Sequence, residues 1–126
     1  MIRLRSLLTV ASVSSLAVVG STALLAHPGS AKVPAAQVRA LNLARNTAVA
    51  ENGGLGNYRP QPCMFSTNTG GDECLIKNNA DGFTYRFLGG APGWSEYNNP
   101  ATTETEIQIA PDGYTVERVI YNGVPR

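Results

Sequence analysis

The sequence is poor in the side chains that most enzymes use for nucleophilic or metal chemistry. It has one histidine, His27, and two cysteines among 126 residues. His27 lies in a segment that we expect to be removed, so the remaining chain can form no Ser-His pair, no Cys-His pair and no histidine metal site. Glycine-rich phosphate loops of the GxGxxG or GxxxxGKS/T type are absent as well. We therefore expect a protein that is not an enzyme and that uses no cofactor and no metal.

The sequence also lacks an excess of charge of either sign. The full chain has 10 basic and 9 acidic residues; without Arg3 and Arg5, 8 basic residues face the 9 acidic ones, a net charge of -1. The other arginines are scattered, with acidic residues between them. Nucleic-acid binding and docking on an anionic membrane both need clustered basic residues. We expect neither kind of partner once the N-terminal segment is removed.

The first 31 residues have the pattern of an export signal. Arg3 and Arg5 precede a mostly apolar stretch over Leu7–Ala26, and Gly29-Ser30-Ala31 supplies small residues at a cleavage site before Lys32. A retained membrane anchor is the alternative, because the apolar stretch is long. No second apolar run follows. We expect residues 32–126 to form a single small domain in the periplasm, a lumen or the extracellular space.

Both cysteines, Cys63 and Cys74, lie in the part that we expect to be exported. Two cysteines in a small exported domain are most simply a disulfide. The loop of about 12 residues that it would close is worth roughly 3 kcal/mol in the chain-entropy model. The spacing is too long for a C-x-x-C redox motif, so the sequence predicts a structural disulfide.

One helix is predicted over 34–51. Pro34 suits the first helical turn, and Asn52-Gly53-Gly54 ends the helix, with Gly53 in the left-handed conformation. Leu55 is expected to fold back onto the last turn. The predicted apolar stripe of the helix consists of residues at three- and four-residue steps, namely Val38, Leu41, Ala44 and Ala48. Arg39 and Arg45 do not share a face, and we expect both to be ordinary solvated positions.

The rest of the chain has the alternation typical of half-buried strands. Strands are predicted over 83–88, 102–110 and 114–121, followed by a tail over 122–126. The prolines make 58–62 extended, and the short apolar runs at 63–65 and 74–76 predict a disulfide-closed hairpin or loop. We therefore expect an α+β domain in which one N-terminal helix packs on an antiparallel sheet of three to five strands.

The long loop predicted over 89–100 holds the candidate binding residues, Pro92, Trp94 and Tyr97. Loops on rigid scaffolds often carry function, and tryptophan and tyrosine recognise partners efficiently. Alternatively, Trp94 folds back to cap the small core. The leading hypothesis is that residues 89–97 and the adjacent sheet bind a protein or a small-molecule or glycan partner. A final strand at the sheet edge also allows a homodimer through strand pairing.

Two carboxylate groupings suggest weaker alternatives. Glu104 and Glu106 lie two apart on a predicted strand, roughly 7 Å from each other, which is near glycosidase spacing. The favoured interpretation is the solvated face of an amphipathic strand; a small carboxylate-dependent hydrolase is the alternative. Asp72, Glu73 and Asp81 could suggest calcium, but the EF-hand spacing is not met, so we interpret them as turn residues.

The order of one helix followed by antiparallel strands resembles cystatin-like and PepSY-like domains, which implies a peptidase inhibitor or modulator as an alternative function. The QxVxG-type loop of cystatins is absent, and Pro111-Asp112-Gly113 stands where PepSY domains usually have an Asp-x-x-Thr-Gly turn. The chain is also similar to small exported cyanobacterial proteins of unknown function, which implies an exported helix-and-sheet domain and no particular chemistry. The segments that carry this second resemblance are 44–46, 52–55, 58–60, 89–93 and 121–123.

Overall fold

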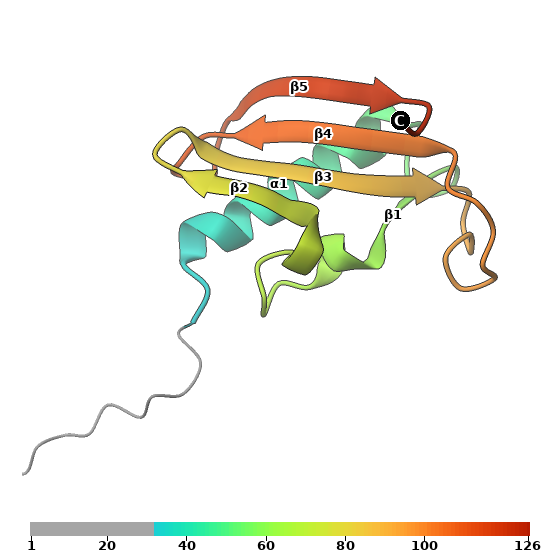
Figure 1. The fold of residues 1–126 in the computed structure, drawn as a ribbon, viewed down its shortest axis with the longest axis horizontal. Helices are drawn as coiled ribbons and strands as arrows, with labels where there is room; N and C mark the ends of the chain where they lie inside the picture. The colour runs from blue at the N-terminus through green and yellow to red at the C-terminus, as the bar shows by residue number, and fades with distance from the viewer. Residues whose placement is uncertain (1–31) are drawn as a thin grey trace, which may run out of the picture.

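The computed structural model describes residues 32–126, so the predicted export signal over 1–31 lies outside the described residues. One helix packs against an antiparallel sheet of five strands, which confirms the α+β class (Figure 1). The elements in chain order are α1 (Ala35–Glu51), β1 (Arg59–Pro60), the 3₁₀ helices η1 (Pro62–Phe65) and η2 (Asp72–Cys74), β2 (Leu75–Asn79), β3 (Gly82–Gly90), β4 (Thr103–Ile109) and β5 (Val116–Gly123).

Helix α1 begins one residue later than predicted, because Pro34 has an extended backbone (ψ 142°) and flanks the helix instead of entering it. Gly53 ends the helix with a φ of +93°, as predicted. The buried face differs from the predicted stripe by the inclusion of Gln37 and Ala40, while Val38 is only half-buried. Gln37 turns inward because its side-chain amide donates a hydrogen bond to the Gly70 carbonyl at 3.4 Å.

The prediction for Leu55 is wrong, since this side chain is 48% exposed. The chain turns immediately after the helix: the amides of Asn57 and Tyr58 both donate to the Gly54 carbonyl, at 3.0 and 2.9 Å. This turn directs Tyr58 into the core and leaves Leu55 outside it. The residues after the helix therefore bury an aromatic ring in place of the expected leucine.

The sheet has the strand order β1-β3-β4-β5, and β2 pairs with the same central strand, β3. The predicted alternation on β3 and β4 is confirmed, although β3 extends to Gly90 and shortens the predicted loop. Paired side chains on the helix-facing side are buried, namely Phe83 with Ile109, Tyr85 with Ile107, and Phe87 with Thr105. These pairs and the small residues of α1 form the core.

Strand β5 lies two residues later than predicted, because the turn after β4 extends through Thr115, whose carbonyl accepts a hydrogen bond from the Ala110 amide. The predicted tail is partly strand. Asn122 accepts a hydrogen bond of 2.7 Å from the Thr105 hydroxyl. The register between β4 and β5 shifts twice. Such bulges, with the charges of Glu117 and Arg118, are features that protect an edge strand from pairing.

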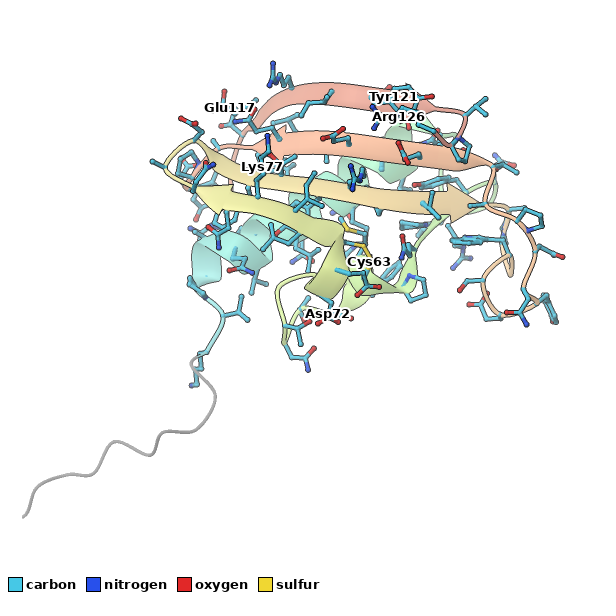
Figure 2. All side chains as sticks on the ribbon, viewed as in Figure 1. Cys63, Asp72, Lys77, Glu117, Tyr121 and Arg126 are labelled. Carbon is cyan, nitrogen blue, oxygen red and sulfur yellow. A yellow bond between two sulfur atoms is a disulfide. The ribbon has the colours of Figure 1, made fainter. Side chains whose placement is uncertain are left out.

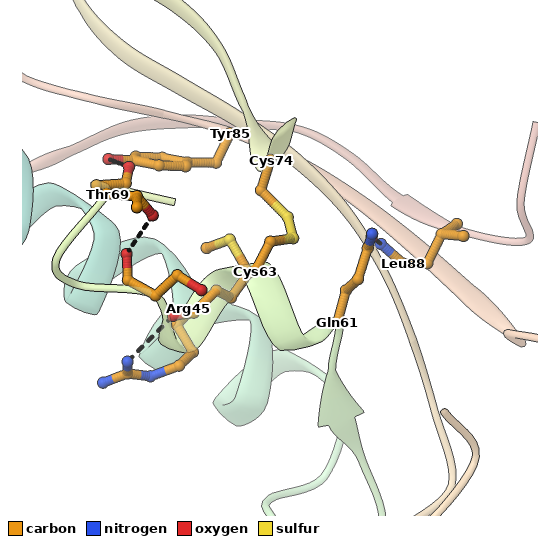
Figure 3. Close-up of a disulfide and its surroundings, with 10 residues drawn as sticks. Arg45, Gln61, Cys63, Thr69, Cys74, Tyr85 and Leu88 are labelled. Carbon is orange, nitrogen blue, oxygen red and sulfur yellow. Dashed lines mark hydrogen bonds between the residues drawn. A yellow bond between two sulfur atoms is a disulfide. The ribbon is translucent and has the colours of Figure 1, made fainter. Parts of the chain in front are cut away.

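The Cys63–Cys74 disulfide is confirmed, with a Cα–Cα distance of 5.9 Å (Figure 3). Of the two forms expected around it, the structure has the disulfide-closed loop and not the hairpin: Cys63 lies in η1, and Cys74 ends η2. Arg45 is not simply solvated, because its guanidinium donates to the Met64 carbonyl at 3.1 Å and stacks on Phe65. The disulfide and this arginine together hold η1 against the helix and the sheet.

Arg39 also makes specific contacts at the other end of the helix. Its guanidinium donates two hydrogen bonds to the Asp112 carbonyl, at 3.1 and 2.8 Å, and lies 4.3 Å from the centre of the Tyr114 ring. The turn between β4 and β5 is thereby joined to α1.

The disulfide indicates an oxidising, exported environment. Within residues 32–126, no helix has both the length and the apolar character needed to cross a membrane.

Candidate functional site

The segment between β3 and β4 is folded into consecutive turns. The Trp94 amide donates to the Ala91 carbonyl at 3.0 Å, and the Asn99 amide donates to the Trp94 carbonyl at 2.8 Å. The ends of the segment are closed by a 2.9 Å hydrogen bond from the Thr102 amide to the Gly89 carbonyl. These bonds hold the loop in a defined conformation, so its side chains are presented at fixed positions.

Trp94 is held from two sides. Its indole N–H donates a 2.8 Å hydrogen bond to the Arg59 carbonyl on β1. Its ring lies so close to Gly90 that a Cβ at that position would be 2.9 Å from the ring Cγ. The side chain is half-buried. Trp94 thus packs on the end of the sheet, and its remaining surface faces a cleft.

The cleft has a volume of about 350 Å³, which lies within the usual range for small-molecule sites. One wall is the 92–96 part of the loop and the other is the 59–65 segment. The lining is rich in rings, with Pro60, Pro62, Phe65, Pro92 and Trp94. Two of the three predicted binding residues, Pro92 and Trp94, are therefore brought together.

The third predicted residue, Tyr97, does not line the cleft. Its side chain is 78% exposed, and its ring lies near Gly93, where a Cβ would be 3.0 Å from two ring carbons. Phe65, on the opposite wall, was not predicted; it is 51% exposed although it is a large aromatic residue. Phe65 thus adds an exposed aromatic ring to the wall of the cleft opposite Trp94.

Two charged residues also line the cleft, Arg59 and Glu96. The Arg59 Nε donates to the Leu55 carbonyl at 2.9 Å, which fixes the stem of the side chain. Within residues 32–126, ion pairs are formed only by Arg126. The positive and the negative group at the cleft are therefore both available to a ligand.

The two glutamates of the hydrolase alternative are bridged by an arginine. The Arg126 guanidinium contacts Glu104 Oε2 at 2.6 Å and Glu106 Oε2 at 3.0 Å. It also lies 3.9 Å from the centre of the Tyr121 ring, and Figure 2 labels both residues of this stacked pair. Hydrogen bonds to both carboxylates raise the pKa of Arg126 above its usual value. The expectation of a fully solvated face is wrong for Glu104, which is buried. Both carboxylates serve a structural contact.

The acidic residues considered for calcium lie in different elements. Asp72 and Glu73 belong to η2 beside the disulfide, and Asp81 lies in the turn between β2 and β3. In the described part of the chain, no group of three or more histidine, cysteine or acidic side chains is placed to hold a metal ion.

A second hollow, which sequence reasoning missed, lies over the strands near the turn between β2 and β3. Its volume is about 120 Å³. It is lined by Lys77, Asn79, Asp81, Thr84, Gln108, Arg118 and Ile120. These residues come from four strands and one turn, so only the strand register brings them together.

Comparison of the chain with protein-family models, curated proteins and solved structures finds no match. Function must therefore be inferred from the chemistry of the sites themselves.

Proposed function

We propose that the protein is an exported, non-enzymatic binding domain that takes a partner or ligand into the cleft between the 92–96 loop and the 59–65 segment. The observation that carries this proposal is the fixed position of Trp94 at the wall of that cleft. The disulfide supports an exported location; within it, we place the protein in the periplasm, a lumen or the extracellular space, after cleavage of the 1–31 segment.

The chemistry of the walls indicates the kind of group that the cleft accepts. The indole N–H of Trp94 is already bonded to the Arg59 carbonyl, so the indole offers a ligand its apolar ring surface. Proline rings and Phe65 extend that surface across the cleft. Such walls suit the apolar face of a sugar ring or the apolar side chains of a protein partner. Arg59 and Glu96 would orient polar groups of the ligand.

The loop is organised before any ligand arrives. The hydrogen bonds of the loop and of the indole are formed in the free protein. A side chain that is already ordered loses little conformational entropy on binding, so more of the contact energy appears as affinity. This is the property expected of a binding surface rather than of a disordered connection.

Trp94 is the only tryptophan in the chain, so its fluorescence reports directly on the cleft. The protein is titrated with a panel of oligosaccharides and of short peptides that contain proline and aromatic residues. We expect at least one ligand class to give a saturable change in emission. Calorimetry with Trp94→Ala should show that this binding is lost, whereas the control Tyr114→Ala, which alters an exposed tyrosine outside the cleft lining, should retain it.

The variants also define what contradicts the proposal. If Trp94→Ala remains folded by circular dichroism and keeps every interaction of the parent protein, the cleft is not the binding site. A panel of cysteine peptidases and metallopeptidases tests the inhibitor alternative, which predicts inhibition at micromolar protein concentration.

A further inference from the structure

A row of four polar side chains crosses the face of the sheet opposite α1. Lys77 on β2 pairs with Thr84 on β3, Thr84 pairs with Gln108 on β4, and Gln108 pairs with Arg118 on β5. Neighbouring strands are about 4.8 Å apart, so the row extends over about 14 Å with a cation at each end. Figure 2 shows Lys77 on this open face, away from the helix. All four residues line the hollow of about 120 Å³, which we call the sheet hollow.

The turn beside the sheet hollow is fixed by two side-chain amides. Asn79 Oδ1 accepts a hydrogen bond from the Asp81 amide at 2.9 Å, and Gln108 Nε2 donates to the Asp81 carbonyl at 3.0 Å. Because the oxygen of Asn79 is used by the turn, its side-chain N–H groups remain as donors to the hollow. The Thr84 hydroxyl is a further donor in the same lining.

The charge on this face is unevenly distributed. Towards the other end of the face, Glu104 and Glu106 are both bonded to Arg126. Neither Lys77 nor Arg118 forms an ion pair with any described residue. Asp81 is the one acidic residue in the lining of the sheet hollow, and Glu106, which lies two residues before Gln108 on β4, is paired with Arg126.

We propose that the sheet hollow binds a single oxyanion group of the phosphate or sulfate type. The Arg118 guanidinium provides a planar pair of donors, the Lys77 ammonium provides a compact positive charge, and the amide and hydroxyl donors lie between them. The small volume of the hollow, about 120 Å³, matches one such group rather than a polymer. The cleft beside Trp94 shares no lining residue with the sheet hollow, so this inference does not depend on the function proposed above.

The test is a titration of the ¹⁵N-labelled protein with inorganic phosphate at low ionic strength, followed by NMR. We expect saturable shifts of the signals of Lys77, Thr84 and Gln108. Each of the variants Lys77→Gln and Arg118→Gln should weaken the affinity about tenfold, the usual effect of losing one charge-assisted hydrogen bond. Asp81→Asn should strengthen binding, because it removes the acid from the lining.

The matched control is Arg86→Gln, which removes a positive charge from β3 outside the lining of the sheet hollow. We expect this variant to bind phosphate within a factor of two of the parent. If Arg86→Gln weakens binding as much as Lys77→Gln, or if phosphate causes no saturable shift, the proposal is refuted. If Lys77→Gln has a lower melting temperature than the parent protein, Lys77→Arg is used instead. This variant keeps the charge and must retain binding for the proposal to stand.

A second arm identifies the source of the oxyanion. The protein is mixed either with glycerol phosphate or with phosphatidylcholine vesicles that contain phosphatidic acid. Co-sedimentation with the vesicles that is lost in Lys77→Gln would support a lipid headgroup. Binding of glycerol phosphate without co-sedimentation would support a free phosphate ester, and binding of neither would contradict the proposal.

Discussion

Two buried tyrosines provide a matched test of how the core treats polar groups. Tyr85 is fully buried, and its hydroxyl donates to the Gln37 carbonyl at 3.2 Å, with the Gly70 carbonyl at 3.5 Å. Tyr58 is 2% exposed, but its hydroxyl has no hydrogen-bond partner among the described residues. The two side chains therefore differ in whether the buried oxygen is satisfied.

The difference predicts opposite effects for the same substitution at neutral pH. Tyr85→Phe removes a hydroxyl that forms a hydrogen bond and should lower the free energy of unfolding by about 1 kcal/mol. Tyr58→Phe removes an unsatisfied group from the core and should raise that free energy by about 1 kcal/mol. The Thr105 hydroxyl lies beside Tyr58 but offers it no proton, because it donates to Asn122 Oδ1 at 2.7 Å.

Alkaline pH adds a second readout. Burial raises the pKa of Tyr58 from 10.0 to about 12. The folded state keeps the Tyr58 phenol neutral, whereas the unfolded chain ionises it above pH 10. The contribution of the buried phenol to the free energy of unfolding is therefore fully present below pH 10. It is lost between pH 10 and about 12, at a cost of about 3 kcal/mol for Tyr58. Burial also raises the pKa of Tyr85. The ionisation of both tyrosines therefore lowers the free energy of unfolding at alkaline pH.

Urea denaturation at pH 7 and at a series of pH values from 9 to 12 measures both effects. Above pH 10, the free energy of unfolding of each phenylalanine variant should fall less steeply than that of the parent protein. At pH 7, only Tyr85→Phe should have a lower free energy of unfolding than the parent. The reasoning is wrong if Tyr58→Phe is destabilised as much as Tyr85→Phe at pH 7. It is also wrong if the alkaline loss is the same in Tyr58→Phe and the parent.

Three further perturbations follow from the contacts. Reducing the disulfide should lower the free energy of unfolding by about 3 kcal/mol and the melting temperature by on the order of 15 °C, as differential scanning calorimetry with and without reductant would show. Gly82→Ala should lower the free energy of unfolding, measured by urea denaturation, by about 3 kcal/mol. The reason is that φ is +114° and the new Cβ would be 2.0 Å from the Ile109 carbonyl oxygen. The control Gly54→Ala, with φ +89° and open space, should cost only about 1 kcal/mol. Arg126→Gln should lower the melting temperature at low salt, and the difference from the parent should shrink in 1 M NaCl, because salt screens its two ion pairs.

Local patterns were sufficient to predict the strands that form the middle of the sheet. On β3 and β4, large apolar side chains recur at every second residue, and a strand places such residues on one face. The disulfide followed from the cysteine count and the expected export. These features depend on neighbours in sequence or on composition, which are visible without a structure.

The errors arise where a distant segment decides the outcome. Gln37 is buried because its amide reaches Gly70, which lies 33 residues away. Strand β5 begins later than predicted because the turn before it extends through Thr115, and the same turn is bonded to α1 by the distant pair Arg39 and Asp112. Propensity and periodicity describe the chain locally, so they could not reveal either contact.

The candidate site also depends partly on local sequence and partly on contacts between distant segments. The composition of the 89–97 loop predicted Pro92 and Trp94, but the second wall of the cleft lies about 30 residues earlier in the chain. That wall reaches Trp94 because β1 pairs with the end of β3, with Arg59 opposite Gly90. The position of an exposed Phe65 beside the cleft is a signal that only the folded chain provides. One wall of a cleft can be predicted from sequence, whereas the pairing of two walls depends on tertiary structure.

The two proposed sites lie at opposite ends of one rigid element. Gly90 of β3 supports Trp94 at the cleft, while Gly82 begins the same strand next to the turn of the sheet hollow. Nine residues of strand place these glycines about 26 Å apart. Substitutions at such a separation usually act independently, so a change at Lys77 should leave binding at Trp94 unaffected. The central strand therefore both completes the core and separates two surfaces of different chemistry, an apolar cleft and a basic hollow, and each can be tested without disturbing the other.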